Sequence, residues 1–254
     1  MTINQVFEIL KDAGGIRAAR IITDNVKNPS HLRVWFMARA LRRGVPVAKI
    51  IHQKWFYGLP FYTNKYTLDP RPDTETLVAA VIADNPQNPK ILDLGTGTGC
   101  IIISLVKNIH GATGTAVDIS RRAIRVARRN TKNFDLSNKI KITRASFGAP
   151  RAVREKFDII VSNPPYIAIG DPRVDAGAKH DPKLALYAAH GGNAAYEQIA
   201  KNAKNWLKKS GRIYVEIGAG AGDAVKKIFE SNRWKFVRAE RDLSGITRVL
   251  VFTI

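Results

Sequence analysis

After the segment "DPRPDTE", residues 69–75, short apolar runs alternate with amphipathic ones, and this alternation most constrains the fold. The apolar runs have the length of strands and the amphipathic runs the length of helices. We expect strands at 90–94, 112–118, 140–144, 157–162, 211–217, 235–240 and 247–253, with helices near 74–83, 100–108, 120–131, 193–208 and 222–231. Such alternation predicts an α/β fold with βαβ units and a mostly parallel sheet. Only a short polar turn joins the last two strands, so these should pair antiparallel.

The chain before this region has a different texture. Apolar residues recur there at helical spacing, and "DAGG", "KNPS" and "RRGVP" divide them into short helices. The next segment, "KWFYGLPFYTNKYTL", alternates aromatic and polar residues around Gly58 and Pro60, which is typical of a hairpin. We therefore expect a helical domain over 1–54, a linking β-hairpin over 55–70 and an α/β domain over 71–254.

The chain is strongly basic, with 41 Lys and Arg against 21 Asp and Glu and a net charge of +20. This favours nucleic-acid or ribosome proximity, or an acidic partner, but does not bear on the fold. The alternative is a generally basic proteome or a surface charged for solubility. Residues 121–156 hold twelve Lys or Arg and two acids, with arginines at helical spacing. Two interpretations stay open: a solvated helix face, or a surface that steers an acidic partner. Cys100 is the single cysteine and the start lacks a signal-peptide pattern, so we expect a cytoplasmic protein.

A glycine loop follows the first expected strand of the sheet, in "ILDLGTGTGC". Gly95, Gly97 and Gly99 let the backbone turn sharply and let a ligand approach the main chain. The next strand ends in Asp118, nineteen residues after Gly99. A carboxylate there can accept hydrogen bonds from both ribose hydroxyls, which predicts a nucleoside ligand. The alternative role for Asp118 is to cap the following helix, for which Ser120 competes.

The segment "FDIIVSNPPYI" ends a strand in an unusually stiff turn. Both prolines fix φ and remove donors, so the turn is rigid before any ligand arrives. The Asn163 side-chain carbonyl and the Pro164 main-chain carbonyl can accept the two N–H bonds of a planar nitrogen, which orients its lone pair. Tyr166, after Pro165, can stack on a flat amide or base. The alternative is a purely structural turn.

These residues resemble the class I S-adenosylmethionine-dependent methyltransferases, and "NPPY" resembles the motif of those that methylate planar nitrogens. Over the whole chain the resemblance is to the release factor glutamine methyltransferases, the PrmC/HemK family. It is carried, in order, by "RRGVPVAKIIHQKWFYGLPF", "PRPDTE", "DLGTGTGC", "VDIS", "VSNPPYI", "DPKLAL", "VEIG" and "DLSGITRVL".

This resemblance implies a Rossmann-like, seven-stranded sheet with an antiparallel last strand. It implies methyl transfer from S-adenosylmethionine, without a metal, to the side-chain amide nitrogen (N5) of the glutamine in the Gly-Gly-Gln motif of peptide chain release factors. S-adenosylhomocysteine is the product. Residues 71–254 become the methyltransferase domain and 1–54 the substrate-docking domain of a monomer that does not contact membranes.

The resemblance also implies roles for individual residues. Cofactor contacts are expected from Asp93, Gly95, Thr96, Gly97, Gly99, Asp118, Ile119, Ser146, Phe147 and Asn163, and substrate contacts from Asn163, Pro164, Pro165 and Tyr166. Asp93 is expected to hold the methionine amino group, or else to satisfy loop amides at a strand end. The linker motif Arg71, Asp73, Thr74 and Glu75 is expected to close the site over the cofactor, or else to start a helix, with Arg71 in a surface ion pair.

The chain departs from the family at two positions. Ser146 stands where many members carry an acidic residue for the adenine amine, and Asp181 stands where Glu-Pro is common. Three other functions are compatible with parts of the sequence. Glutamine methylation of a ribosomal protein is disfavoured by "RPDTE". Adenine-amine methylation of DNA or RNA fits the charge but lacks a target-recognition module. A non-catalytic nucleoside-binding protein is disfavoured by the intact "NPPY".

Overall fold

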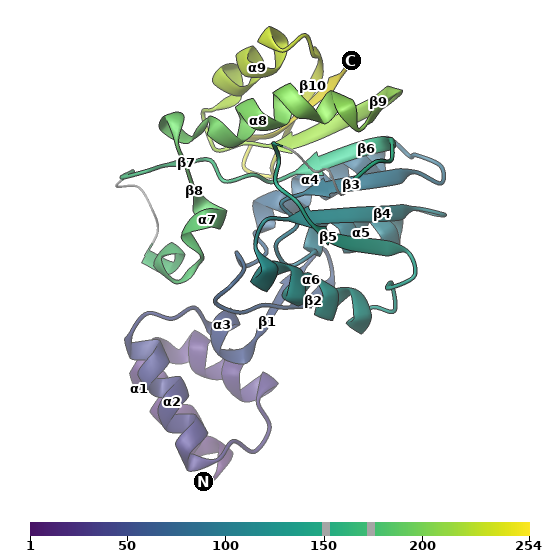
Figure 1. Ribbon diagram of the computed structural model, residues 1–254. Helices are drawn as coiled ribbons and strands as arrows, with labels where there is room; N and C mark the ends of the chain where they lie inside the picture. Colours follow the sequence, from purple (N-terminus) through teal and green to yellow (C-terminus); the bar gives the residue numbers. More distant parts are fainter. Residues whose placement is uncertain (149–152, 172–175) are drawn as a thin grey trace.

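The computed structural model describes residues 1–148, 153–171 and 176–254, and its centre is a seven-stranded sheet (Figure 1). The strands are β3 (Lys90–Leu94), β4 (Thr113–Asp118), β5 (Ile140–Arg144), β6 (Phe157–Ser162), β9 (Leu207–Glu216), β10 (Lys235–Arg241) and β11 (Thr247–Thr253). Their order is β10-β11-β9-β6-β3-β4-β5. Strands β5, β4, β3, β6 and β9 pair parallel, whereas β11 pairs antiparallel with both β9 and β10. The predicted sheet, with its antiparallel last strand, is confirmed.

Helices cover both faces of this sheet. They are α4 (Pro72–Ala83), α5 (Cys100–Asn108), α6 (Arg121–Asn133), α8 (Ala194–Asn202) and α9 (Gly222–Ser231). Successive strand residues point to opposite faces, so Ile91 packs in the core that contains α4 and α5, and Leu92 packs in the core that contains α8 and α9. Helix α6 packs on β4, β5 and the hairpin. Because both faces are covered, the strands read as continuous apolar runs in the sequence.

The first fifty residues form three helices with a hydrophobic core of their own. These are α1 (Ile3–Asn25), α2 (His31–Arg42) and α3 (Val47–Ile51), shown at the bottom of Figure 1. The expected break in "DAGG" is a kink at Gly15, whose φ is 85°, and α1 continues beyond it. The hairpin follows as β1 (Gln53–Phe56) and β2 (Leu59–Tyr62), joined by Tyr57 and Gly58, both at positive φ.

One predicted boundary was wrong. The helix expected over 193–208 ends at Asn202, a 3₁₀ turn η3 (Ala203–Asn205) follows, and β9 begins at Leu207. Trp206 and Leu207 are buried in the core beneath α8 and α9, so this segment joins the sheet four residues before the expected start at 211. Apolar burial here outweighs the polar "KKS" that reads as a turn in the sequence.

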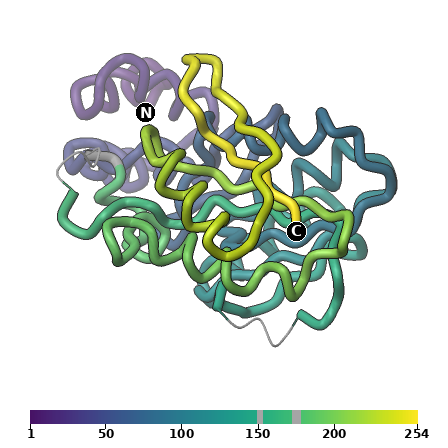
Figure 2. The backbone as a smooth tube through the Cα atoms, turned by 90° about the horizontal axis from the view of Figure 1, so that it is seen from above, coloured from purple at the N-terminus to yellow at the C-terminus, as the bar shows by residue number. Residues whose placement is uncertain are grey.

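Several short elements between β6 and α8 were not predicted. They are β7 (Ile167–Ala168), η1 (Ala176–His180), α7 (Lys183–Leu186), β8 (Tyr187–Ala188) and η2 (His190–Gly192). In Figure 1 this segment extends away from the sheet toward the N-terminal helices. Figure 2 shows the β10–β11 hairpin, in yellow, projecting from the body of the molecule. Within the described part of the chain, no helix has the length and apolarity needed to span a bilayer.

Candidate active site

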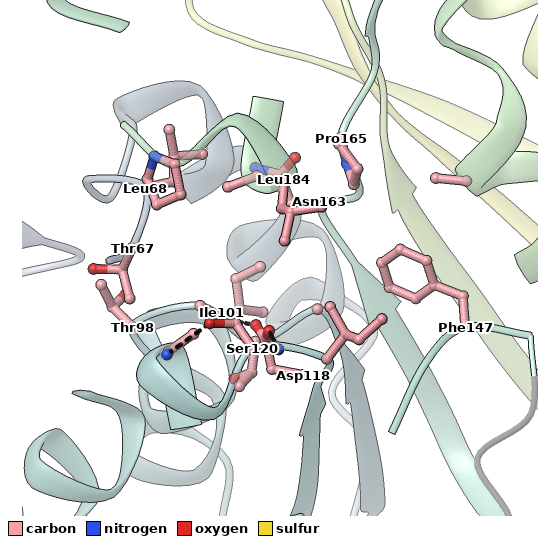
Figure 3. Close-up of a pocket in the computed structure, with 18 of the residues that line it drawn as sticks. Thr67, Leu68, Thr98, Ile101, Asp118, Ser120, Phe147, Asn163, Pro165 and Leu184 are labelled. Atoms are coloured by element: carbon pink, nitrogen blue, oxygen red, sulfur yellow. Dashed lines mark hydrogen bonds between the residues drawn. The ribbon is translucent and has the colours of Figure 1, made fainter. Parts of the chain in front are cut away.

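A cavity of about 310 Å³ opens where β3, β4 and β6 end (Figure 3). Asp118 lies on one side of it, while Asn163 and Pro165 lie on the other (Figure 3). The chain leaves β3 toward β4 on one side and returns to β6 on the other, so the cavity lies at a topological switch point. In open α/β sheets this is where ligands bind.

The glycine loop forms one wall of the cavity. Gly95, Gly97 and Gly99 have φ of 80°, 55° and 82°, which glycine adopts without steric cost. Gly95 and Gly97 line the cavity, whereas Gly99 lies behind them at the start of α5. A Cβ on Gly95 would lie 3.1 Å from the Phe147 ring, so a side chain there would crowd the wall. The loop is therefore a cradle of exposed backbone.

Asp118 holds this loop in place. Its Oδ2 accepts a hydrogen bond from the Gly97 amide at 3.0 Å, and its Oδ1 accepts one from the Ser120 amide at 2.8 Å. The Oγ of Ser120 caps α6 by accepting a hydrogen bond from the Ala123 amide at 3.2 Å. Asp118 is therefore not the N-cap residue of this helix. Burial raises the pKa of Asp118, and the backbone amides oppose that rise. Each carboxylate oxygen keeps a further acceptor site for a ligand in the cavity.

Asp93 lies behind the loop rather than on the cavity. It is fully buried, and its Oδ2 accepts a hydrogen bond from Thr96 Oγ1 at 2.6 Å. Its Oδ1 has no hydrogen-bond partner among the described residues. Burial, and secondarily the nearby Asp118, raise the pKa of Asp93 to about 7. Any influence of Asp93 on a ligand passes through Thr96, which does line the cavity.

One side of the cavity forms a largely apolar slot that suits the flat part of a ligand. Ile119, Ser146 and Phe147, for which we expect cofactor contacts, all line the cavity, and Ile101 joins them. Figure 3 shows Phe147 and Ile101 around the same space as Asp118. Ile119 is half exposed, at 53%, although it is a large apolar side chain at a strand end. An aromatic ligand that covered Ile119 would remove this apolar surface from water.

The turn after β6 presents a fixed amide to the cavity. Asn163 Nδ2 donates to Thr74 Oγ1 at 3.0 Å, so Asn163 Oδ1 is left to accept from a substrate. Pro165 lines the cavity and Pro164 is buried. Tyr166 lies behind the turn, where a Cβ on Gly218 would lie 3.0 Å from its ring. Burial raises the pKa of Tyr166 to about 12, which keeps its hydroxyl protonated.

Glu216 also belongs to this site, although no sequence pattern singles it out within "VEIG". It ends β9 with 2% of its surface exposed, and burial raises its pKa to about 8. Contacts with the side chains of Thr74 and Asn163 oppose that rise. The amide of Asn163 is therefore backed by both Thr74 and Glu216. An acid at a strand end in an apolar context, as for Asp93, is the signal that could have found it.

The linker motif is divided between the cavity and other tasks. Arg71 and Thr74 line the cavity, and Thr74 lies in the first turn of α4. Asp73 forms an ion pair with Arg248 at 2.7 Å, and Glu75 accepts from the Tyr57 amide of the hairpin at 2.8 Å. The motif thus starts α4 and also forms part of the cavity wall.

Arg71 belongs to a partly buried ion network rather than to a surface pair. Its Nη2 lies 2.9 Å from Asp181 Oδ2, and Lys49 Nζ lies 3.0 Å from Asp181 Oδ1. Lys49 Nζ also lies 2.8 Å from Asp69 Oδ1. The side chains of Lys49, Asp69 and Asp181 are 4%, 9% and 2% exposed. This network joins α3, the linker and the segment before α7. That segment forms part of the cavity wall.

Comparison with known proteins finds methyltransferases among the proteins similar to this chain. A family model described as the methyltransferase small domain matches residues 69–179. The release factor glutamine methyltransferase of Streptococcus pneumoniae is 40% identical over 211 residues, which cover 81% of this chain and 74% of that protein. A bifunctional methyltransferase of Rickettsia felis is 37% identical over 239 residues, and the chain spans only 45% of its length. A solved methyltransferase structure from Pyrococcus furiosus superposes with a TM-score of 0.60 at 15% identity, covering 88% of this chain and 98% of that one.

Proposed function

The chain belongs to the release factor glutamine methyltransferases, and from this premise we propose that it methylates N5 of the glutamine in a Gly-Gly-Gln motif of a release factor. One observation carries the proposal. The Asn163 amide, held by Thr74, faces a cavity whose other side carries Asp118 and the glycine cradle. The residue that can orient a planar nitrogen and the residues that suit a nucleoside therefore line the same cavity.

The residues present fit S-adenosylmethionine. The cradle of Gly95 and Gly97 admits close approach of a ligand to the backbone, and a Cβ on Gly95 would crowd it. We assign the ribose hydroxyls to Asp118 and the adenine to the slot of Ile119, Ser146 and Phe147. We assign the methionine end of S-adenosylmethionine to Thr96, whose hydroxyl donates a hydrogen bond to Asp93. When bound, the cofactor supplies an electrophilic methyl group on a sulfonium.

The acceptor amide is activated by orientation. An amide nitrogen is a poor nucleophile because its lone pair is delocalised into the carbonyl. Asn163 Oδ1 and the Pro164 carbonyl accept hydrogen bonds from its two N–H groups and aim the nitrogen at the methyl group. The nitrogen and the methyl carbon are then held in a reactive orientation. Tyr166, packed on Gly218, braces the turn from behind. A proton leaves the nitrogen after attack.

The N-terminal helices offer a surface for docking the protein substrate. Leu32, Trp35 and Phe36 of α2 are 65%, 51% and 56% exposed, although they are large and apolar. An exposed apolar patch of this kind marks an interaction surface more often than a solvated one. We assign this face of the 1–54 domain to the release factor.

The test is to locate the methyl group. The protein is incubated with S-adenosylmethionine carrying an isotopic methyl label and, separately, with release factor, ribosomal protein, DNA or RNA. Mass spectrometry should find the label on the glutamine of the Gly-Gly-Gln motif. A release factor with asparagine at that glutamine is the matched control and should stay unlabelled. Label on a ribosomal protein or on adenine, with none on release factor, would refute the proposal.

A further inference from the structure

A second hollow, of about 380 Å³, lies between β2 and α6. Its lining, which we call the Arg–Tyr groove, consists of Tyr62, Asn64, Tyr66, Arg122, Arg125, Val126 and Arg129. Tyr66 also lines the active-site cavity, so the two hollows adjoin. The functions assigned above to the cavity make no use of the groove.

The arginines of the groove are stacked on its tyrosines. The guanidinium carbon of Arg129 lies 3.5 Å from the centre of the Tyr62 ring, and that of Arg122 lies 4.6 Å from the centre of the Tyr66 ring. Stacking on an aromatic face fixes the plane of a guanidinium while leaving the N–H donors at its edge free. The groove therefore presents oriented cationic donors rather than mobile ones.

The cations of α6 have no acidic partners among the residues that the structure describes. The helix "RRAIRVARRNTKN" holds six basic residues and no acid, and none of the six forms an ion pair with a carboxylate in the described ranges. Arg121, Arg125 and Arg129 follow one another at spacings of four, an arrangement in which like charges on a helix repel. A polyanion in the groove would relieve this repulsion.

We propose that the Arg–Tyr groove binds a single-stranded nucleic acid. Cations backed by aromatic rings suit a strand whose phosphates contact the edges of the guanidinium groups and whose bases stack on the outer faces of the arginine–tyrosine pairs. The one aliphatic side chain of the groove, Val126, is buried, so the lining offers guanidinium donors and ring edges rather than aliphatic surface. The charge pattern thus favours a phosphodiester strand over an acidic protein surface.

The binding assay uses the intact protein and fluorescently labelled oligouridylate and oligodeoxythymidylate. Fluorescence anisotropy gives the affinity at several salt concentrations, and comparing the two strands separates RNA from DNA. In the test variant Arg122, Arg125 and Arg129 are changed to Gln. In the control variant the exposed Lys209, Lys227 and Lys235 are changed to Gln, which removes the same charge elsewhere.

Three lost phosphate contacts should weaken binding about a hundredfold at roughly 0.1 M salt and reduce the slope of log affinity against log salt by about 2. The lysine variant should keep the slope of the unaltered protein. Tyr62→Leu, which keeps the backbone bonds of residue 62 to Asn130, should cost roughly tenfold on oligonucleotide and nothing on inorganic polyphosphate.

Three results would overturn the proposal. The first is equal loss of oligonucleotide binding in the arginine and lysine variants. The second is full binding of oligonucleotide by Tyr62→Leu, which would mark a bare polyanion site. The third is unchanged oligonucleotide binding by the arginine variant together with slower methylation of release factor, which would mark an acidic protein partner. Methylation of a short Gly-Gly-Gln peptide should be unchanged in all these variants. A failure of the nucleic-acid proposal can therefore be distinguished from a failure of the proposed methyl acceptor.

Discussion

Lys49 should be one of the most sensitive positions of the molecule outside the cavity. Its ammonium lies 2.8 Å and 3.0 Å from two carboxylates, those of Asp69 and Asp181, and its side chain is 4% exposed. Lys49→Met keeps the length of the stem and removes the charge. It leaves two buried carboxylates close together, and within the described ranges only Asp181 then retains a cation, Arg71. Removing one partner of a buried pair costs about 3–5 kcal/mol, because the remaining charge stays desolvated.

For a chain of this size that loss corresponds to a fall in Tm of roughly 6–20 °C. Thermal unfolding followed by circular dichroism measures it, with Lys11→Met as the control. Lys11 forms its ion pair with Glu8 at the surface, so its removal should leave Tm unchanged. Because Asp181 belongs to the segment that walls the cavity, the Lys49 variant should also bind S-adenosylmethionine more weakly, as calorimetry would show.

Two further measurements distinguish lost charge from lost packing. Burial already raises the pKa of Asp181, and removing Lys49 raises it further, so acid protonates the Asp181 carboxylate. The native variant then binds a proton that the unfolded chain does not, and its deficit should shrink as pH falls toward the ordinary carboxyl pKa of about 4. Adding Asp69→Asn should restore part of the lost stability. A deficit that is below about 1 kcal/mol, that ignores pH, or that grows with Asp69→Asn would refute the reasoning.

Three other substitutions test the cavity. Asn163→Ala should slow methyl transfer on the order of 10²-fold or more while leaving S-adenosylmethionine affinity nearly unchanged, because the lost carbonyl orients the acceptor; near-normal turnover would contradict this role. Asp118→Ala should weaken S-adenosylmethionine binding by roughly 1.5–3 kcal/mol by calorimetry, and unchanged affinity would limit Asp118 to holding the loop. Glu216 has a pKa of about 8 against an ordinary 4.5, so the native protein retains a proton that the unfolded chain releases, and stability falls as pH rises between these values. Glu216→Gln should make this fall less steep in urea unfolding at a series of pH values, and an unaltered slope would place the titration elsewhere.

The sequence predicted those parts of the site that are built from local segments. The glycine loop, Asp118 and the turn at Asn163 each follow directly from a strand, and the chemistry of each can be read from neighbouring letters. The seven strands were also predicted, because buried parallel strands are continuous apolar runs. Only the start of β9 was misplaced, where burial of Leu207 overrides a polar segment.

The remaining parts depend on residues that the fold brings together from afar. Arg71 meets Asp181 across 110 residues, and Lys49 reads in the sequence as one more helical surface lysine. Nothing local shows that Lys49 will be buried between two carboxylates. Glu216 likewise gains its role only when β9 lies beside β6 and brings it to Asn163. A sequence pattern reports periodicity and local chemistry, whereas these contacts arise from strand order.

Strand order has a further consequence, for the assembly of the chain during synthesis. Strand β11 follows β10 in the chain, yet it lies between β9 and β10 in the sheet. Until Thr247–Thr253 leaves the ribosome, the edge of β9 that will receive it has no partner. That edge belongs to a strand whose Ile213, Tyr214 and Val215 are at most 1% exposed in the finished fold. A nascent or truncated chain that stops before β11 therefore carries an open apolar edge, which is a template for aggregation until the last strand is inserted.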